Sequence, residues 1–393
     1  MNKKGLIGTY SYSIIASANN ITAGIVAYMM LTYSEVSSTT VAMVMTIPAI
    51  TGTLFAFMSG KVINHFGTKK VAIGLEILEL LSGMIYFLFG NKTSVAVLWI
   101  AAALYGFMMG GSGVLLGQLI NENIEDKRDT STYIGYSNSI MSLGGVFFAS
   151  VGGIIAAKDG GANWQRAYLL YGLIVVAIIV GLICLPNNTN DKEIVEENKQ
   201  KSNDKLPLSV YLMSLHYGLY FMILYTFSLN VSEYVIVTHN LGTSAEAGNA
   251  ISFITIGGIV AGLTYRMYSN ILTNKTVFTM VLLTAVGLGI IYFAPNVVAM
   301  YIASFIIGFA MYGVGPYIMA KMSRITTKEG YPQALSIFSG FTNVGLLISL
   351  YVFNFLSNIV YGNPGNVDGK IFIAMIGTAI LALLAIPLYK NND

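Results

Sequence analysis

The chain has 393 residues, of which 55% are hydrophobic and only 10% are charged. A soluble domain carries about 25% charged residues, and a folded chain of this size cannot hide so much apolar surface from water. The composition therefore excludes a soluble protein and indicates that lipid is the main solvent. A net charge of +3 without a basic run argues against a nucleic-acid partner. The single cysteine, Cys184, excludes an internal disulfide.

The first apolar run begins after Lys4 and continues to about Tyr33. It is far longer than the apolar part of a signal peptide, and no cleavage site of the A-x-A kind follows it. We therefore expect a retained first transmembrane helix.

A transmembrane helix needs about 20 mostly apolar residues, and the chain offers twelve such runs. They lie near residues 7–33, 38–60, 70–90, 95–118, 131–157, 167–186, 208–236, 246–268, 275–294, 297–322, 333–358 and 370–389. The polar break after the sixth run is rich in Asn, Lys and Glu, which predicts a solvated linker. We predict an all-α membrane protein of twelve transmembrane helices. Two six-helix bundles, residues 1–186 and 208–393, are joined by a cytoplasmic linker, residues 187–207.

The basic residues separate to opposite ends of these helices. If the N-terminus is cytoplasmic, 17 of the 21 lysines and arginines fall on the inner side. The 4 on the outer side are Lys92, Lys158, Arg166 and Lys370. Cytoplasmic loops carry the excess of basic residues, so we expect both termini and the linker to be cytoplasmic.

Two stretches in the fourth and tenth helices share the pattern G-F-x-M-x-G-x-G. They span residues 106–113 and 308–315, which are 202 positions apart, close to half the chain. Closely spaced glycines let a neighbouring backbone approach a helix, and their repetition predicts two related halves. Chance is the alternative, because Gly, Phe and Met are common in membrane helices. The predicted packing glycines here are Gly106, Gly111, Gly113, Gly308, Gly313 and Gly315.

The loop between the second and third helices reads GKVINHFGTKK from Gly60. Together with twelve helices in two halves, it resembles the motif G-x-x-x-D-x-x-G-R-R-x of the major facilitator superfamily, a family of secondary transporters. Gly60, Gly67, Lys69 and Lys70 match the motif, whereas Asn64 replaces the aspartate and offers no ion pair. The resemblance implies a conformational latch between the two halves, weaker than usual or held by hydrogen bonds. A tight turn with positive-inside residues would explain the basic pair alone.

The fifth helix partly matches a second family motif, roughly G-x8-G-x3-G-P-x2-G-G, which is typical of antiporters. Gly135, Gly144, Gly152 and Gly153 fit its spacing, but the Gly-Pro centre is absent. Small residues that pack two membrane helices explain these glycines equally well. The segment before the sixth helix, NWQRAY from Asn163, also resembles a family signature, although an aromatic residue and an arginine are common at membrane interfaces.

No enzyme constellation is visible in the sequence. The three histidines have no H-E-x-x-H arrangement and no cysteine partner, and no P-loop is present. We therefore expect no catalytic residue, no metal and no cofactor. Energy for transport would come from an ion or substrate gradient.

Glu76 and Glu79 on the third helix are the candidates for coupling transport to protons. They are three residues apart and so share a helix face, on the order of 10 Å inside the membrane at about 1.5 Å per residue. A carboxylate at that depth is costly unless it is protonated or paired, which suits a proton carrier. Alternatively, the helix begins deeper and Glu76 lies near the headgroups. The resemblance also makes this helix peripheral, which counts against a role in the cavity.

Polar residues near the membrane midplane form the candidate substrate site. In the family, the first, fourth, seventh and tenth helices line a central cavity, so the resemblance places Asn19, Asn20, Tyr225 and Tyr312 there. Any one of these would also serve to bridge two helices, and His216 could equally be a neutral imidazole bonded between helices. The full set of cavity candidates is Asn19, Asn20, Asn138, His216, Tyr220, Tyr225, Tyr312 and Asn343.

No Arg or Lys lies near the midplane to hold a carboxylate or phosphate, so an anionic substrate is disfavoured. We expect a proton-coupled transporter in a bacterial inner membrane, a monomer that works by alternating access on a small molecule. Aromatic and Met side chains favour export of a hydrophobic or cationic compound. The alternatives are uptake of a small neutral metabolite and a membrane sensor or assembly protein that has lost transport.

Overall fold

The computed structural model describes residues 2–91, 94–124, 130–186, 206–326 and 331–390. Every regular element in these ranges is a helix, and eleven stretches of them are long and apolar enough to cross a membrane. One stretch, Ser244–Phe293, is 50 residues long and contains two helices, α10 (Ser244–Leu272) and α11 (Thr276–Phe293). The prediction of twelve transmembrane helices is therefore confirmed.

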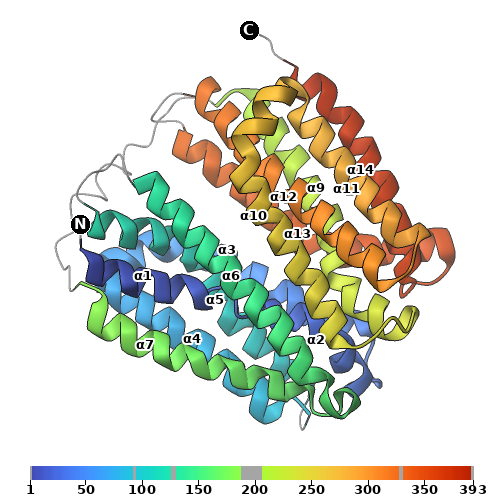
Figure 1. Cartoon of the computed structure of the whole chain (residues 1–393), viewed down its shortest axis with the longest axis horizontal. Helices are drawn as coiled ribbons and strands as arrows, with labels where there is room; N and C mark the ends of the chain where they lie inside the picture. Colours follow the sequence, from blue (N-terminus) through green and yellow to red (C-terminus); the bar gives the residue numbers. More distant parts are fainter. Residues whose placement is uncertain (1, 92–93, 125–129, 187–205, 327–330, 391–393) are drawn as a thin grey trace. The chain divides into compact units, whose positions relative to one another are not determined.

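The chain divides into two compact units, Met1–Lys201 and Ser202–Asp393. The helices of the first unit are α1 (Lys3–Ile15), α2 (Asn20–Thr32), α3 (Ser38–Phe66), α4 (Thr68–Phe89), α5 (Val95–Asn123), α6 (Thr130–Ala157), η1 (Lys158–Gly161), η2 (Trp164–Tyr171) and α7 (Gly172–Cys184) (Figure 1). Those of the second unit are α9 (Leu208–Glu233), the π-helical η3 (Tyr234–Thr238), α10, η4 (Thr273–Lys275), α11, α12 (Val297–Ile325), α13 (Tyr331–Tyr361) and α14 (Val367–Tyr389). Most of the predicted linker, residues 187–205, lies outside the described residues.

Polar side chains fix where several of these helices begin. The side chains of Ser37, Ser94 and Asn296 accept hydrogen bonds from backbone N–H groups in the first turns of α3, α5 and α12. Thr243 and Glu246 form a capping box at the start of α10. Such caps satisfy N–H groups that have no partner within the helix, which sharpens the boundary between loop and membrane helix.

Contacts between glycines and backbone atoms hold the closest helix pairs of the first unit together. A Cβ atom on Gly106 would lie 2.6 Å from the carbonyl oxygen of Pro48, and one on Gly110 would overlap the carbonyl oxygen of Gly52. The backbones of α5 and α3 therefore touch, as expected for glycine-mediated packing. The pair α6 and α1 meets in the same way, because a Cβ on Gly144 would overlap a carbonyl oxygen of α1.

The second unit repeats this packing plan with its own helices. A Cβ on Gly308 of α12 would overlap the carbonyl oxygen of Ile254 on α10, and one on Gly345 of α13 would overlap the carbonyl oxygen of Gly218 on α9. Gly106 and Gly308 occupy the same position in the two copies of the repeated pattern. The repeat therefore preserves one close helix crossing in each unit.

The other predicted packing glycines differ in what they meet. Gly111 and Gly152 make room for the side chains of Leu75 and Ile21, whereas nothing lies within 4 Å of a Cβ on Gly113. In the second unit, a Cβ on Gly313 would lie 3.0 Å from the hydroxyl of Tyr268, and one on Gly315 2.8 Å from that of Tyr217. Gly153 is buried in α6, and the surroundings of Gly135 lie outside what the structure describes.

The first transmembrane helix is broken near its centre. α1 ends at Ile15 and α2 begins at Asn20, and the backbone between them tightens into bonds that span three residues. The N–H of Ala18 donates to Ile15 O at 2.8 Å, and the N–H of Asn20 donates to Ser17 O at 3.1 Å. A short 3-10 stretch inside a helix often marks a hinge. Irregular backbone at membrane depth is tolerated only where protein or a wet cavity surrounds it.

We expect Gly110→Ala to lower the melting temperature of the protein in detergent, because the added methyl group would overlap the carbonyl oxygen of Gly52 and separate α5 from α3. Overpacking of this kind costs about 1–3 kcal/mol. Gly117→Ala in the same helix is the matched control, since nothing lies within 4 Å of a Cβ there. It should leave the melting temperature unchanged or raise it through better helix propensity. Equal melting temperatures for Gly110→Ala and wild type would contradict the close crossing.

Candidate functional site

The break in the first transmembrane helix presents two amide side chains, Asn19 and Asn20, both partly buried. They lie near the middle of the membrane-spanning stretch Lys3–Thr32. Oδ1 of Asn19 accepts a hydrogen bond of 2.7 Å from Thr22 Oγ1. The amide nitrogen of Asn20 lies 2.6 Å from where a Cβ on Gly145 would stand, so a larger residue at 145 would displace it. The break therefore concentrates polar groups at a depth where they are costly unless they have hydrogen-bond partners or face a water-filled cavity.

A layer of aromatic rings continues from the break into the start of the sixth transmembrane helix. The hydroxyl of Tyr168 on η2 lies 2.8 Å from Thr22 Oγ1, and its ring stacks on Tyr86 of α4 with centroids 4.3 Å apart. Trp164 Nε1 donates a 2.9 Å hydrogen bond to Thr32 Oγ1. Trp164 is fully buried, so the aromatic residue of the NWQRAY segment is a core anchor and not a lipid-interface residue.

Glu76 and Glu79 project from α4 into the interior of the first unit. Their exposed fractions are 1% and 0%, so both side chains are buried within the protein. α4 begins at Thr68, so Glu76 lies about 12 Å along the helix from its start at about 1.5 Å per residue. Among the described residues, both oxygens of Glu79 and Oε2 of Glu76 have no hydrogen-bond partner.

Tyrosine side chains from two other helices face this carboxyl pair. Tyr12 on α1 lies close enough to both glutamates, and Tyr171 on η2 to Glu79, for electrostatic interaction. Both tyrosines are buried, and their hydroxyls also lack a partner among the described residues. The sequence reasoning did not identify these tyrosines, because nothing local in the sequence connects them to α4. The carboxyl pair and these hydroxyls form the Glu79 cluster, defined as Tyr12, Glu76, Glu79 and Tyr171.

His216 and Tyr220, expected at the cavity, lie instead in the interior of the second unit. His216 Nε2 lies 3.0 Å from the carbonyl oxygen of Leu381, and Nδ1 lies 3.4 Å from the hydroxyl of Tyr389, both on α14. The hydroxyl of Tyr220 lies 2.7 Å from Thr284 Oγ1 on α11. Both side chains are buried, so they join helices of this unit. For His216 this favours the bonded, neutral imidazole.

The other cavity candidates keep some exposure within their own units. Tyr312 on α12 is 42% exposed, and its ring packs against Gly258 of α10, where a Cβ would collide with it. Tyr225 on α9 and Asn343 on α13 are partly buried, and Asn138 on α6 is exposed. These side chains and the two asparagines of the break are all uncharged, and they remain the candidates to contact a solute.

A polar cluster that sequence reasoning missed lies where α14 begins. Lys370, expected on the outer side at the start of the twelfth helix, is only 4% exposed, and its Nζ donates to Asn230 Oδ1 at 3.2 Å. Glu233, also on α9, lies near enough to Lys370 for an electrostatic interaction. His239 Nε2 lies 2.8 Å from Asp368 Oδ1. These contacts tie the π-helical end of the seventh transmembrane helix to the twelfth.

The loop that resembles the family latch is held within the first unit. Gly67 has φ 84° and ψ 151° between α3 and α4, a conformation open almost only to glycine. Thr68 Oγ1 donates to Glu122 Oε1 at 2.5 Å, and Lys69 Nζ donates to Leu182 O at 2.8 Å, while Lys70 is exposed. The surroundings of Gly60 and Asn64 lie outside what the structure describes, and a latch between the halves stays a prediction.

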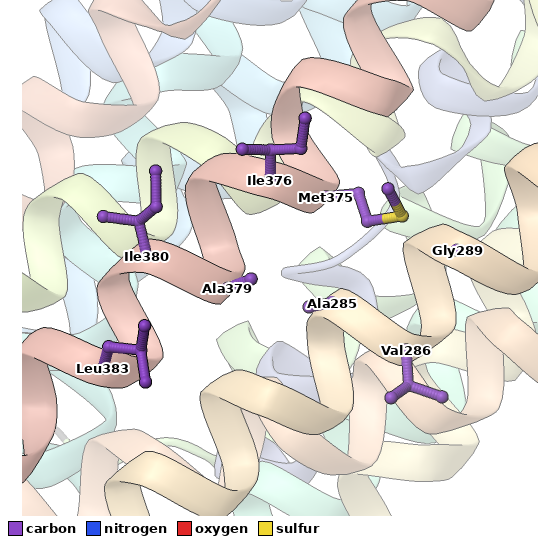
Figure 2. Close-up of a pocket in the computed structure, with 8 residues that line it drawn as sticks. All are labelled: Ala285, Val286, Gly289, Met375, Ile376, Ala379, Ile380 and Leu383. Atoms are coloured by element: carbon purple, nitrogen blue, oxygen red, sulfur yellow. The ribbon is translucent and has the colours of Figure 1, made fainter.

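A groove of about 430 Å³ lies between α11 and α14. Figure 2 shows Ala285, Val286 and Gly289 on one side and Met375, Ile376, Ala379, Ile380 and Leu383 on the other. Every lining residue is apolar, and Ile380 and Leu383 are exposed. Exposed apolar side chains on membrane helices face acyl chains, so this groove is not the site of a polar solute.

Comparison with known proteins gives a family and a fold. The sequence model of the Major Facilitator Superfamily matches residues 9–231 and 214–393, and no curated protein matches the chain significantly.

A mutant of the nucleoside transporter NupG is similar at 12% identity with TM-score 0.76, covering 98% of this chain and 100% of that one. A D-xylose–proton symporter is similar at 16% identity with TM-score 0.74, covering 98% of each. A mutant of the peptide transporter POT in complex with alafosfalin is similar at 12% identity with TM-score 0.76, covering 98% and 93%. Such low identities show the fold alone.

We expect Gly67→Ala to destabilise the turn between α3 and α4, because an alanine there would be held at φ 84°. A strained backbone of this kind costs on the order of 1–3 kcal/mol, visible as a lower melting temperature. Gly74→Ala within α4 is the control, since a Cβ there meets nothing within 4 Å. A loss of stability equal to that of the control would contradict the glycine requirement.

Proposed function

The chain belongs to the major facilitator superfamily, and from this premise we propose that it carries an uncharged small molecule across the membrane by alternating access, driven by an ion gradient. Membership of this family makes the chain a multi-pass membrane transporter rather than an enzyme. The substrate class, the driving ion and the direction of transport belong to the proposal. So do a bacterial inner membrane, cytoplasmic termini and a monomeric state.

The observation that carries the proposal is the absence of charge at the centres of the helices that line the cavity in this family. Those helices are α1 with α2, α5, α9 and α12. Among their described residues, the Asp, Glu, Lys and Arg side chains are confined to helix ends, and they are Lys3, Lys4, Glu122, Glu233, Lys321 and Arg324. A buried ionic substrate needs a partner of opposite charge. Neither a cation nor an anion would find one at mid-depth.

The groups that remain at that depth suit a neutral solute with hydroxyl or amide groups. Asn19 and Asn20 each offer donors and an acceptor, and Tyr312 offers an aromatic face with a hydroxyl. The expected preference for a cationic substrate lacks an acidic partner here, so the proposal does not retain it. Three similar structures are named as carriers of nucleosides, xylose with protons, and peptides, which is compatible with a polar metabolite.

Export of a hydrophobic compound is the second candidate. Gly144 and Gly152, which fit the antiporter spacing, do pack against α1 and α2. However, Gly345 of α13 approaches α9 through the same kind of contact. The packing therefore reflects the repeat in both units and gives export only weak support.

We expect a thermal-shift screen of the purified protein to find ligands among neutral polar metabolites and none among lipophilic cations. A ligand that binds only the folded state raises the melting temperature with its concentration. Asn19→Ala and Asn343→Ala should abolish the shift given by such a ligand. Asn270→Ala, at an exposed position near the end of α10, should preserve it.

Shifts with lipophilic cations alone would contradict the uncharged substrate. Any hit is then assayed for flux in proteoliposomes. Binding without flux of the bound compound would favour the sensor alternative over transport.

A further inference from the structure

The Glu79 cluster lies in the interior of the first unit and contains none of the residues that we expect to contact substrate. It brings together groups from three membrane helices: Tyr12 from α1, Glu76 and Glu79 from α4, and Tyr171 from η2. Transport by the proposed function does not require this cluster for substrate recognition. Its chemistry therefore needs a separate explanation.

The state of Glu79 in this structure fits a protonated carboxyl. The side chain is fully buried, and neither oxygen accepts a hydrogen bond from a described residue. Among those residues, no lysine or arginine pairs with it. An ionised carboxylate in such surroundings would lose its hydration without compensation, and Glu76 nearby would add repulsion because two adjacent carboxylates resist joint ionisation.

The surroundings also supply what Glu79 needs when its proton leaves. The hydroxyls of Tyr12 and Tyr171 are buried and have no partner among the described residues. A tyrosine hydroxyl donates one hydrogen bond. The titratable groups that interact with the pair are Tyr12 of α1 and Tyr171 of η2, with Tyr105 of α5 and Tyr168 of η2 next to these tyrosines, and none of the four is basic. Hydrogen-bond donors are thus present beside Glu79, whereas no lysine or arginine of the described residues pairs with it.

We propose that Glu79, with Glu76, is a proton-binding site enclosed in the first unit, and that Tyr12 and Tyr171 donate hydrogen bonds to Glu79 once it is ionised. The inference rests on the proposed gradient-driven transport and identifies its ion as the proton. The proton moves from the carboxyl to water during the transport cycle and returns from the opposite side. No covalent bond other than the O–H bond forms or breaks.

The position of Tyr12 gives this site a route to the substrate candidates. Tyr12 lies on α1, one turn before the break that begins after Ile15. On the other side of the cluster, Tyr171 lies 5.5 Å from the ring of Tyr168, which bonds Thr22, and Thr22 in turn bonds Asn19. A hydrogen bond that Tyr12 makes only to ionised Glu79 would therefore favour one position of α1 relative to α2.

Infrared difference spectroscopy of the full chain in lipid vesicles tests the site without a substrate. At neutral pH we expect a carbonyl band from a protonated carboxyl that disappears as the pH is raised. Glu79→Gln should remove most of this band. Glu35→Gln, at an exposed position after α2, is the matched control and should retain it.

Absence of the band in wild type, or its persistence in Glu79→Gln, would overturn the proposal. Tyr12→Phe combined with Tyr171→Phe keeps both carboxyls and covers the case in which Glu79→Gln does not fold. Without the two donors, the band should survive to higher pH, and an unchanged titration would count against their role. Loss of the band on addition of NaCl at fixed pH would show that sodium, and not the proton, is the coupling ion.

Transport supplies a second readout once a substrate has been found. Glu79→Gln should abolish accumulation driven by a pH gradient while it leaves counterflow exchange at the wild-type rate. Unchanged uphill transport in this variant would remove Glu79 from the mechanism. A wild-type protein that moves no solute would refute the proposed function, whereas the infrared result would still decide whether Glu79 binds a proton.

Discussion

Direct contact between glycines and the carbonyl oxygens of neighbouring helices is the constraint on which each unit depends. Lipid is as apolar as a leucine side chain, so membrane helices gain little from burying apolar surface against one another and rely on close packing. Gly110 against Gly52 in the first unit and Gly308 against Ile254 in the second leave no room for a methyl group. These crossings determine which side chains are enclosed within each unit.

Some of the polar groups so enclosed have partners on another helix, and others have none among the described residues, such as Tyr268 and Ser304 in the second unit. In the second unit, His216 and Tyr220 each have a partner on another helix, as stable interiors require. In the first unit, both oxygens of Glu79 and the hydroxyls of Tyr12 and Tyr171 have none among the described residues. Unsatisfied buried groups cost stability, and the proposed ionisation of Glu79 would give these oxygens and hydroxyls partners in one another.

The sequence predicted the helix count, the two halves and the family, because hydropathy and glycine spacing are local properties of the chain. It did not predict the break between Ile15 and Asn20, although two adjacent asparagines within an apolar run were its one visible sign. It also placed His216 at a cavity, whereas the ring faces α14. The reason is that lipid-facing and protein-facing sides of a membrane helix are both apolar, so the sequence pattern does not show where a polar side chain points.

The two copies of the repeat share one helix crossing but differ in the surroundings of their other glycines. Their first glycines, Gly106 and Gly308, make the same crossing, but their last glycines, Gly113 and Gly315, face open space and a tyrosine hydroxyl. The first transmembrane helix is broken at its centre, while α9 is continuous and becomes π-helical only at its end. Close packing prevents the substitution of a glycine at a crossing that both units share, since a single added methyl group there disrupts the unit. The unpartnered carboxyls of Glu76 and Glu79 and the central break both lie in the first unit.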